Sequence, residues 1–218
     1  MFSAAIFDMD GLLIDSERII MQACIVAANA HGIRYTQAQF VDLIGRNLTD
    51  STRVMTAQLG GEENFAKVAQ SVDEILALRE DAYPLRPGVS EMLSFFKKNN
   101  IPCGVASSSY QQVIKRRLTK AGVLNHFLHI TSGDEVALGK PHPDIYLLAL
   151  ERLGVVAQEC IAFEDSELGA QAAIAAGLNV VVVPDLKQPS EFVQKNAWMI
   201  VDSLHEALEK MDCSAWVS

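Results

Sequence analysis

The stretch that decides the fold is Ala4-Ala5-Ile6-Phe7-Asp8-Met9-Asp10-Gly11, an apolar run that ends in two aspartates and a glycine. Its first four residues predict a buried β-strand, because the run is short, apolar and followed at once by turn-forming residues. A carboxylate at the end of such a strand is costly to desolvate unless a cation or a proton compensates for its charge. Asp8 and Asp10 are therefore the first candidate functional residues.

Short apolar runs of the same kind recur along the chain. They lie at residues 101–106, 128–131, 161–163, 180–183 and 199–201. Helical patterns separate most of these runs; one of them begins at Pro143 and ends at Gly154. Strands that alternate with helices predict βαβ units. We therefore expect an α/β fold whose core is a doubly wound parallel sheet of the Rossmann-like type.

Residues 15–86 interrupt this alternation. They contain no convincing strand and show only helical periodicity, and two prolines within residues 83–88 stiffen the return to the core. We expect an α/β core domain made of residues 1–14 and 87–218. A small all-helical domain with hinge linkers, residues 15–86, is then inserted after the first strand.

Polar residues follow several of the predicted strands at the point where each strand ends. Glu164 and Asp165 follow one strand, and Ser107, Ser108 and Ser109 follow another. The carboxyl ends of parallel strands lie at one edge of a sheet, where ligand crevices form. We therefore expect these residues to gather near the aspartates that follow the first strand. Taken singly, each could instead cap the helix that comes after it.

Carboxylates without a supporting set of histidines or cysteines favour Mg²⁺ as the bound metal. The five histidines show no HxH or HExxH spacing, so a zinc site is not expected. Lys140, in Gly139-Lys140-Pro141, can reach the same edge of the sheet from a fourth loop. Its charge and the Ser107 hydroxyl are what the outer oxygens of a phosphoryl group need.

In their order and spacing these motifs resemble the haloacid dehalogenase-like hydrolase superfamily. The matching positions are DxDG at residues 8–11, the strand-ending Ser107, Lys140 before a proline, and the acidic pair at 164–165. The run 10–17 and the helical insertion are similar to the branch with a helical cap, which contains sugar-phosphate phosphatases and β-phosphoglucomutases. The dehalogenase branch lacks the second aspartate and the acidic pair, so we expect phosphoryl transfer.

The resemblance implies a role for each carboxylate. Asp8 is expected to be the nucleophile that forms an aspartyl-phosphate, and Asp10 the general acid and then the base. Asp8 and Asp165 are expected to ligate Mg²⁺, with Glu164 at or just behind the ligand positions. Asp10 would join this metal set through its backbone carbonyl, which leaves its carboxylate for proton transfer.

Ser107 and Lys140 complete the catalytic set that the resemblance implies. The residues expected to bind the substrate are Ser108, Ser109, Glu17, Arg46 and Asn47. The last three lie in the helical cap, which can close over a site and exclude water. Plainer interpretations stay open, because Arg46 could be solvated after a helix end and Glu17 could be a favourable acid in a first helical turn.

We expect a Mg²⁺-dependent phosphatase that acts on a small phosphorylated metabolite, namely a sugar phosphate. A β-phosphoglucomutase-like mutase is the alternative, but Ile20 stands where the mutase branch has a histidine and cannot hydrogen-bond a polar group. A non-catalytic binding protein on the same fold is the third possibility. Loss of Asp8 or Asp10 would have favoured it, and both are present.

The 218 residues carry 18 basic and 27 acidic side chains, which gives a net charge of −9. This charge would repel phosphate backbones and anionic lipid, so neither nucleic acid nor a membrane is an expected partner. No apolar run has the length of a membrane span, and the N-terminus does not read as a signal peptide. The four cysteines form no CxxC pair and are expected to be reduced. We expect a cytoplasmic protein that is a monomer or a weak homo-oligomer.

Overall fold

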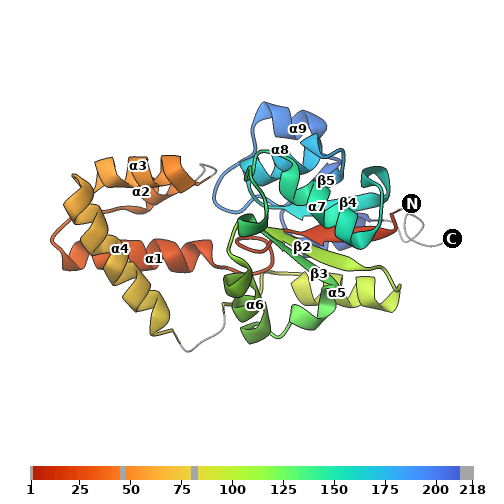
Figure 1. The fold of residues 1–218 in the computed structure, drawn as a ribbon, viewed down its shortest axis with the longest axis horizontal. Coiled ribbons are helices and arrows are strands. Elements are labelled where there is room, and N and C mark those ends of the chain that lie inside the picture. The colour runs from red at the N-terminus through yellow and green to blue at the C-terminus, as the bar shows by residue number, and fades with distance from the viewer. Residues whose placement is uncertain (1, 45–47, 80–82, 212–218) are drawn as a thin grey trace. The chain divides into compact units, whose positions relative to one another are not determined.

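The computed structural model describes residues 2–44, 48–79 and 83–211, which form two compact units (Figure 1). One unit, the core, comprises Met1–Asp15 and Tyr83–Ser218, and the other comprises Ser16–Ala82. From the sequence, the helical domain is predicted at 15–86. That this domain acts as a cap on the core stays a prediction.

The core contains a parallel sheet of six strands in the order β3-β2-β1-β4-β5-β6. The strands are β1 (Ala4–Phe7), β2 (Cys103–Ser107), β3 (His129–Ser132), β4 (Cys160–Glu164), β5 (Asn179–Val182) and β6 (Met199–Ile200). From β1 the chain places β2 and then β3 on one side, and it then returns to place β4 against the other side of β1. The expected doubly wound, Rossmann-like sheet is confirmed, and its switch point lies beside β1.

Two layers of helices cover the sheet (Figure 1). The core helices are α5 (Val89–Lys98), α6 (Gln111–Lys120), α7 (Asp144–Leu153), α8 (Glu167–Ala175), α9 (Glu191–Asn196) and α10 (Leu204–Lys210), with short 3-10 turns η1 (Leu124–His126), η2 (Gly133–Glu135) and η3 (Ala157–Glu159). Alternate residues of β1 face the two helical layers. Phe7 belongs to the apolar cluster that includes residues of α5, α6 and α10 on one face, and Ile6 belongs to the cluster that includes residues of α7, α8 and α9 on the other.

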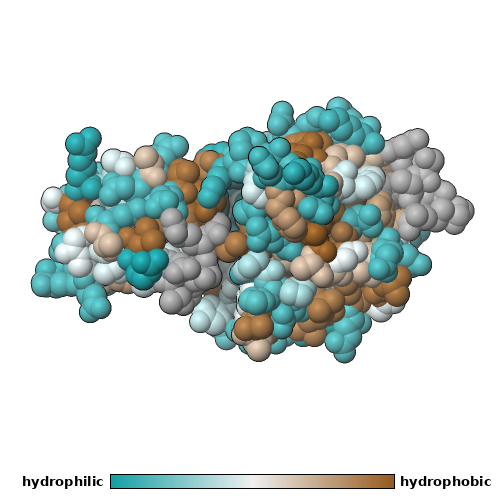
Figure 2. All heavy atoms as spheres, turned by 90° about the horizontal axis from the view of Figure 1, so that it is seen from above, coloured by the Kyte–Doolittle hydropathy of each residue, from teal (hydrophilic) through white to brown (hydrophobic). Residues whose placement is uncertain are grey.

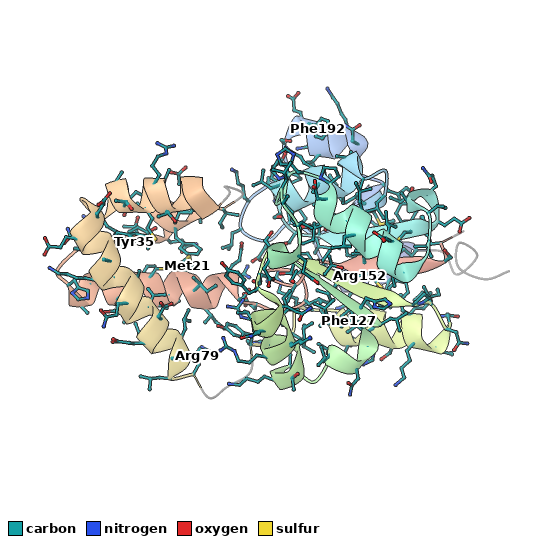
Figure 3. The ribbon with its side chains drawn as sticks, in the orientation of Figure 1. Met21, Tyr35, Arg79, Phe127, Arg152 and Phe192 are labelled. Carbon is teal, nitrogen blue, oxygen red and sulfur yellow. The ribbon has the colours of Figure 1, made fainter. Side chains whose placement is uncertain are left out.

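The second unit is helical. It contains α1 (Glu17–Ala30), α2 (Gln37–Val41), α3 (Leu48–Gln58) and α4 (Glu62–Ala77). Its own apolar core consists of Ala23, Cys24, Ala27, Ala28, Tyr35, Leu59, Val68 and Val72. Tyr35, labelled in Figure 3, is buried in this core while its hydroxyl donates to Gln58 Oε1 at 3.2 Å. A separate core is what allows such an insertion to hold its shape by itself.

Hydrophobic residues on the face seen in Figure 2 occur in small groups among hydrophilic ones. Within the described ranges, no helix combines the length and the apolar character that crossing a bilayer requires.

Phe7, the last residue of β1, lies at the centre of a cluster of aromatic rings. Its ring stacks on Phe163 with centroids 4.7 Å apart and meets Phe96 edge-on at 5.7 Å, and it is fully buried. We expect Phe7→Ala to lower the free energy of unfolding by about 3–5 kcal/mol, because it leaves a large cavity. Urea denaturation tests this, with Phe192→Ala as control because Phe192 is 50% exposed. Equal effects of the two substitutions would contradict the prediction.

Candidate active site

Three carboxylates meet where β1 and β4 end. Asp8 follows β1 directly, Glu164 is the last residue of β4, and Asp165 comes next. Because β1 and β4 are hydrogen-bonded neighbours with Phe7 opposite Phe163, the two strand ends lie side by side. One oxygen of each carboxylate can be chosen so that all three lie within 4.8 Å of one another. All three residues are buried, Glu164 completely.

Lys140 lies against two of these carboxylates. Its Nζ donates to Asp8 Oδ1 and to Glu164 Oε1, both at 2.6 Å, and to the carbonyl of Ala106 at 3.1 Å. Burial by itself would lower the pKa of Lys140, but the two facing carboxylates outweigh it and hold that pKa above its ordinary value. Lys140 is therefore a buried ammonium, and all three of its N–H donors have an acceptor.

Glu164 is also held by partners other than Lys140. Its Oε1 accepts a hydrogen bond from the Tyr146 hydroxyl at 2.5 Å, and its Oε2 accepts one from Ser166 Oγ at 3.2 Å. The Ser166 hydroxyl also accepts from the backbone N–H of Gly169, so Ser166 caps α8. Tyr146 was not predicted from the sequence, because its ring fits the apolar stripe of its helix.

The charges at this site fit a divalent cation. Three carboxylates gather in a buried place, and two of them contact the ammonium of Lys140. Burial raises the pKa of the Asp8 carboxyl above its ordinary value; the Lys140 ammonium opposes this rise, and the Glu164 carboxylate adds to it. A hard cation such as Mg²⁺ prefers such an oxygen set, so the donor chemistry fits the expected metal.

Asp10 lies in a different environment from Asp8. Its Oδ1 accepts from Arg117 Nη1 at 2.5 Å and its Oδ2 accepts from Ser109 Oγ at 2.8 Å. Its carboxylate does not belong to the metal-type cluster found among the described residues. Asp10 is expected in the metal set only through its backbone carbonyl, and that part stays a prediction.

The serines after β2 separate into different positions. Ser107 is buried at the end of β2, and its hydroxyl accepts from the backbone N–H of Ser109 at 3.2 Å. Ser108 is exposed, and Ser109 turns its hydroxyl to Asp10. Since β2 lies next to β1, with Val105 opposite Phe7, this turn lies at the same edge of the sheet as Asp8.

Comparisons with known proteins agree with this geometry. Residues 5–183 match the family described as haloacid dehalogenase-like hydrolase. The chain belongs to this family of hydrolases. It is 33% identical over 203 residues to the phosphorylated carbohydrates phosphatase of Thermotoga maritima, which covers 91% of this chain and 93% of that protein.

Two further proteins similar to this haloacid dehalogenase-like hydrolase have names from sugar-phosphate chemistry. Hexitol phosphatase B of Escherichia coli K12 is 32% identical over 184 residues, which are 83% of each chain. The crystal structure of β-phosphoglucomutase from Clostridium difficile has a TM-score of 0.74 at 26% identity, and the match covers 94% of this chain and 93% of that one. The resemblance stated from the motifs alone is thus confirmed.

The expected cap residues of this hydrolase are only partly described. Glu17 is the first residue of α1 and is the acid in its first turn, as the plainer interpretation had it. Its contact with substrate stays a prediction. Arg46 and Asn47 lie outside the described residues.

Gly169 leaves room for the Glu164 carboxylate in this hydrolase. A Cβ placed on Gly169 would come within 2.0 Å of Glu164 Oε1. We expect Gly169→Ala to lower the free energy of unfolding by about 1–3 kcal/mol, because the carboxylate must leave its partners or the helix must shift. Thermal and urea unfolding measure this.

Gly139→Ala is the control for that substitution, because a Cβ there meets nothing within 4 Å and the backbone is not left-handed. An unchanged stability of Gly169→Ala, equal to that of the control, would show that Glu164 is not packed against this helix.

Proposed function

We propose that the chain is a Mg²⁺-dependent phosphatase that hydrolyses a small phosphorylated metabolite, a sugar phosphate, through an aspartyl-phosphate. The observation that carries this proposal is the buried Asp8 carboxylate, bonded to Lys140 beside Glu164 and Asp165 at the edge of the sheet. A carboxylate nucleophile gives an acyl phosphate, which is labile, so one hard displacement is split into two easier ones.

The proposed first step is transfer of the phosphoryl group to Asp8. An Asp8 oxygen forms a bond to phosphorus while the bond between phosphorus and the ester oxygen breaks. Asp10 gives its proton to the departing ester oxygen, which leaves as an alcohol. Lys140 and the Ser107 hydroxyl contribute positive charge and a hydrogen bond toward the phosphoryl oxygens.

The proposed second step returns the enzyme to its starting state. Asp10, now ionised, takes a proton from water as the water oxygen attacks phosphorus. The bond between phosphorus and Asp8 breaks, which releases inorganic phosphate and restores the Asp8 carboxylate. One ester and one water are consumed, and one alcohol and one phosphate are formed.

Asp8, Glu164 and Asp165 are the residues that would hold Mg²⁺. When bound, the metal supplies charge that offsets the repulsion between an anionic nucleophile and a phosphoryl group, on the order of 5 kcal/mol at 3 Å and an effective dielectric of 20. Gly11 supports this arrangement, because a Cβ there would come within 2.1 Å of Asp165 Oδ2. The glycine thus lets the carboxylate approach the loop that carries Asp8 and Asp10.

The substrate class rests on the relatives. Proteins named phosphorylated carbohydrates phosphatase and hexitol phosphatase B are 33% and 32% identical to this chain. The mutase alternative is supported by the likeness to β-phosphoglucomutase. Against it, Ile20 replaces the histidine of the mutase branch, and in this structure Ile20 packs against the apolar core of the helical unit.

The setting of the proposed enzyme follows from its charge and its cysteines. Cys24, Cys103 and Cys160 are buried and free, which fits a reducing compartment. We place the protein in the cytoplasm, as a monomer or a weak homo-oligomer that binds no nucleic acid, since its net charge is −9.

Phosphate release tests the proposal directly. Purified protein is incubated with hexitol, hexose, pentose and triose phosphates, with Mg²⁺ or with EDTA. We expect release that EDTA abolishes and that Asp8→Asn lowers by roughly a thousandfold or more, because the nucleophile is lost. If the protein releases no phosphate but isomerises glucose 1-phosphate in the presence of a sugar bisphosphate, the mutase is the correct function.

Thermal unfolding with and without MgCl₂ tests the metal site. At a Mg²⁺ concentration a hundred times its Kd, we expect a gain of about 2.7 kcal/mol in the free energy of unfolding. Asp165→Asn should remove most of this gain, whereas Asp202→Asn, at an exposed position on the same core unit, should keep it. A gain that survives in Asp165→Asn would place the metal elsewhere.

A further inference from the structure

Arg117 reaches Asp10 from a distant part of the chain. It lies on α6, 107 residues after Asp10, and its Nη1 is 2.5 Å from Asp10 Oδ1. The side chain of Arg117 is 12% exposed and that of Asp10 is 26% exposed, so solvent screens this pair less than an ordinary surface pair. A largely buried guanidinium on a carboxylate constrains the direction of that carboxylate.

Arg117 is itself held from two sides. Ile114 and Leu118 bury the inner face of α6 in the apolar core, which holds the helix that carries Arg117 in place. Its guanidinium carbon lies 4.8 Å from the centre of the Tyr83 ring, a cation–π contact. The guanidinium therefore has little freedom to follow Asp10 if Asp10 turns away.

The two oxygens of Asp10 have partners of different chemistry. The Ser109 hydroxyl at Oδ2 can donate to a carboxylate or accept from a carboxylic acid. The Arg117 guanidinium at Oδ1 can only donate. Arg117 thus occupies Oδ1 with a group that can only donate, whereas Oδ2 has a partner that can donate or accept.

We propose that Arg117 is a positioning residue that aims Oδ2 of Asp10 at the leaving group. This inference rests on the proposed function, in which Asp10 protonates the departing ester oxygen. Arg117 would then matter most for substrates whose leaving group needs a proton, such as sugar phosphates. An aryl phosphate such as p-nitrophenyl phosphate releases a stabilised anion and needs that proton far less.

The test compares two substrates in Arg117→Met, which keeps an unbranched apolar stem and removes the guanidinium. The quantity is kcat/KM, because it reports the steps through departure of the leaving group. For the best sugar phosphate of the panel we expect a loss of roughly tenfold to a hundredfold. For p-nitrophenyl phosphate we expect a loss of less than about threefold.

Arg116→Met is the matched control, since Arg116 is the next residue on the same helix and is exposed. It should change neither value. Equal losses of Arg117→Met on both substrates would mean a merely structural role and would overturn the inference, as would no loss on either. If Arg117→Met does not fold, Arg117→Lys is measured in the same way, and it should show a smaller loss that is still confined to the sugar phosphate.

The two proposals fail in distinguishable ways. If the wild-type protein releases phosphate from neither substrate, the proposed function is wrong. If the wild-type protein hydrolyses both and Asp8→Asn hydrolyses neither, while Arg117→Met behaves as Arg116→Met does, only the role of Arg117 is wrong.

Discussion

The rest of the site depends on the buried ammonium of Lys140. Its three donors meet the carbonyl of Ala106 on β2, the carboxylate of Asp8 after β1, and the carboxylate of Glu164 on β4. One cation therefore ties together the ends of three adjacent parallel strands. Removal of the ammonium would leave two buried carboxylates uncompensated, and such a loss costs more than the net value of the ion pair. The strand order that brings these ends together is thus coupled to the chemistry at the edge.

Two glycines make the density of charge at this edge possible. Gly11 leaves room for the Asp165 carboxylate, and Gly169 leaves room for the Glu164 carboxylate, because a Cβ at either position would overlap a carboxylate oxygen. Gly11 also has a φ of +87°, a backbone conformation that favours glycine. The carboxylates are therefore packed against backbone rather than water, which strengthens their electrostatic interactions and their demand for a cation.

The sequence predicted the elements that periodicity and strand ends encode. Asp8 stands out because an apolar run stops at it, and Glu164 because the parallel-sheet rule places it on the same edge. Tyr146 and Arg117 were missed for a physical reason. The ring of Tyr146 belongs to an apolar helical stripe and only its hydroxyl reaches Glu164, while Arg117 meets a residue 107 positions away. The local sequence pattern does not predict such contacts, because they form only when helices pack on the sheet.

The separate environments of Asp8 and Asp10 explain how two aspartates so close in sequence can take different roles. Asp8 shares a buried cluster with Lys140, Glu164 and Asp165 that could hold a metal ion, and Asp10 has its own guanidinium and hydroxyl partners. A metal held by the first cluster need not draw on the Asp10 carboxylate, because that carboxylate already has a cation of its own. The proposed acid and base is therefore held by partners other than those that hold the proposed metal ligands, so the two tasks fall to separate side chains of one short loop.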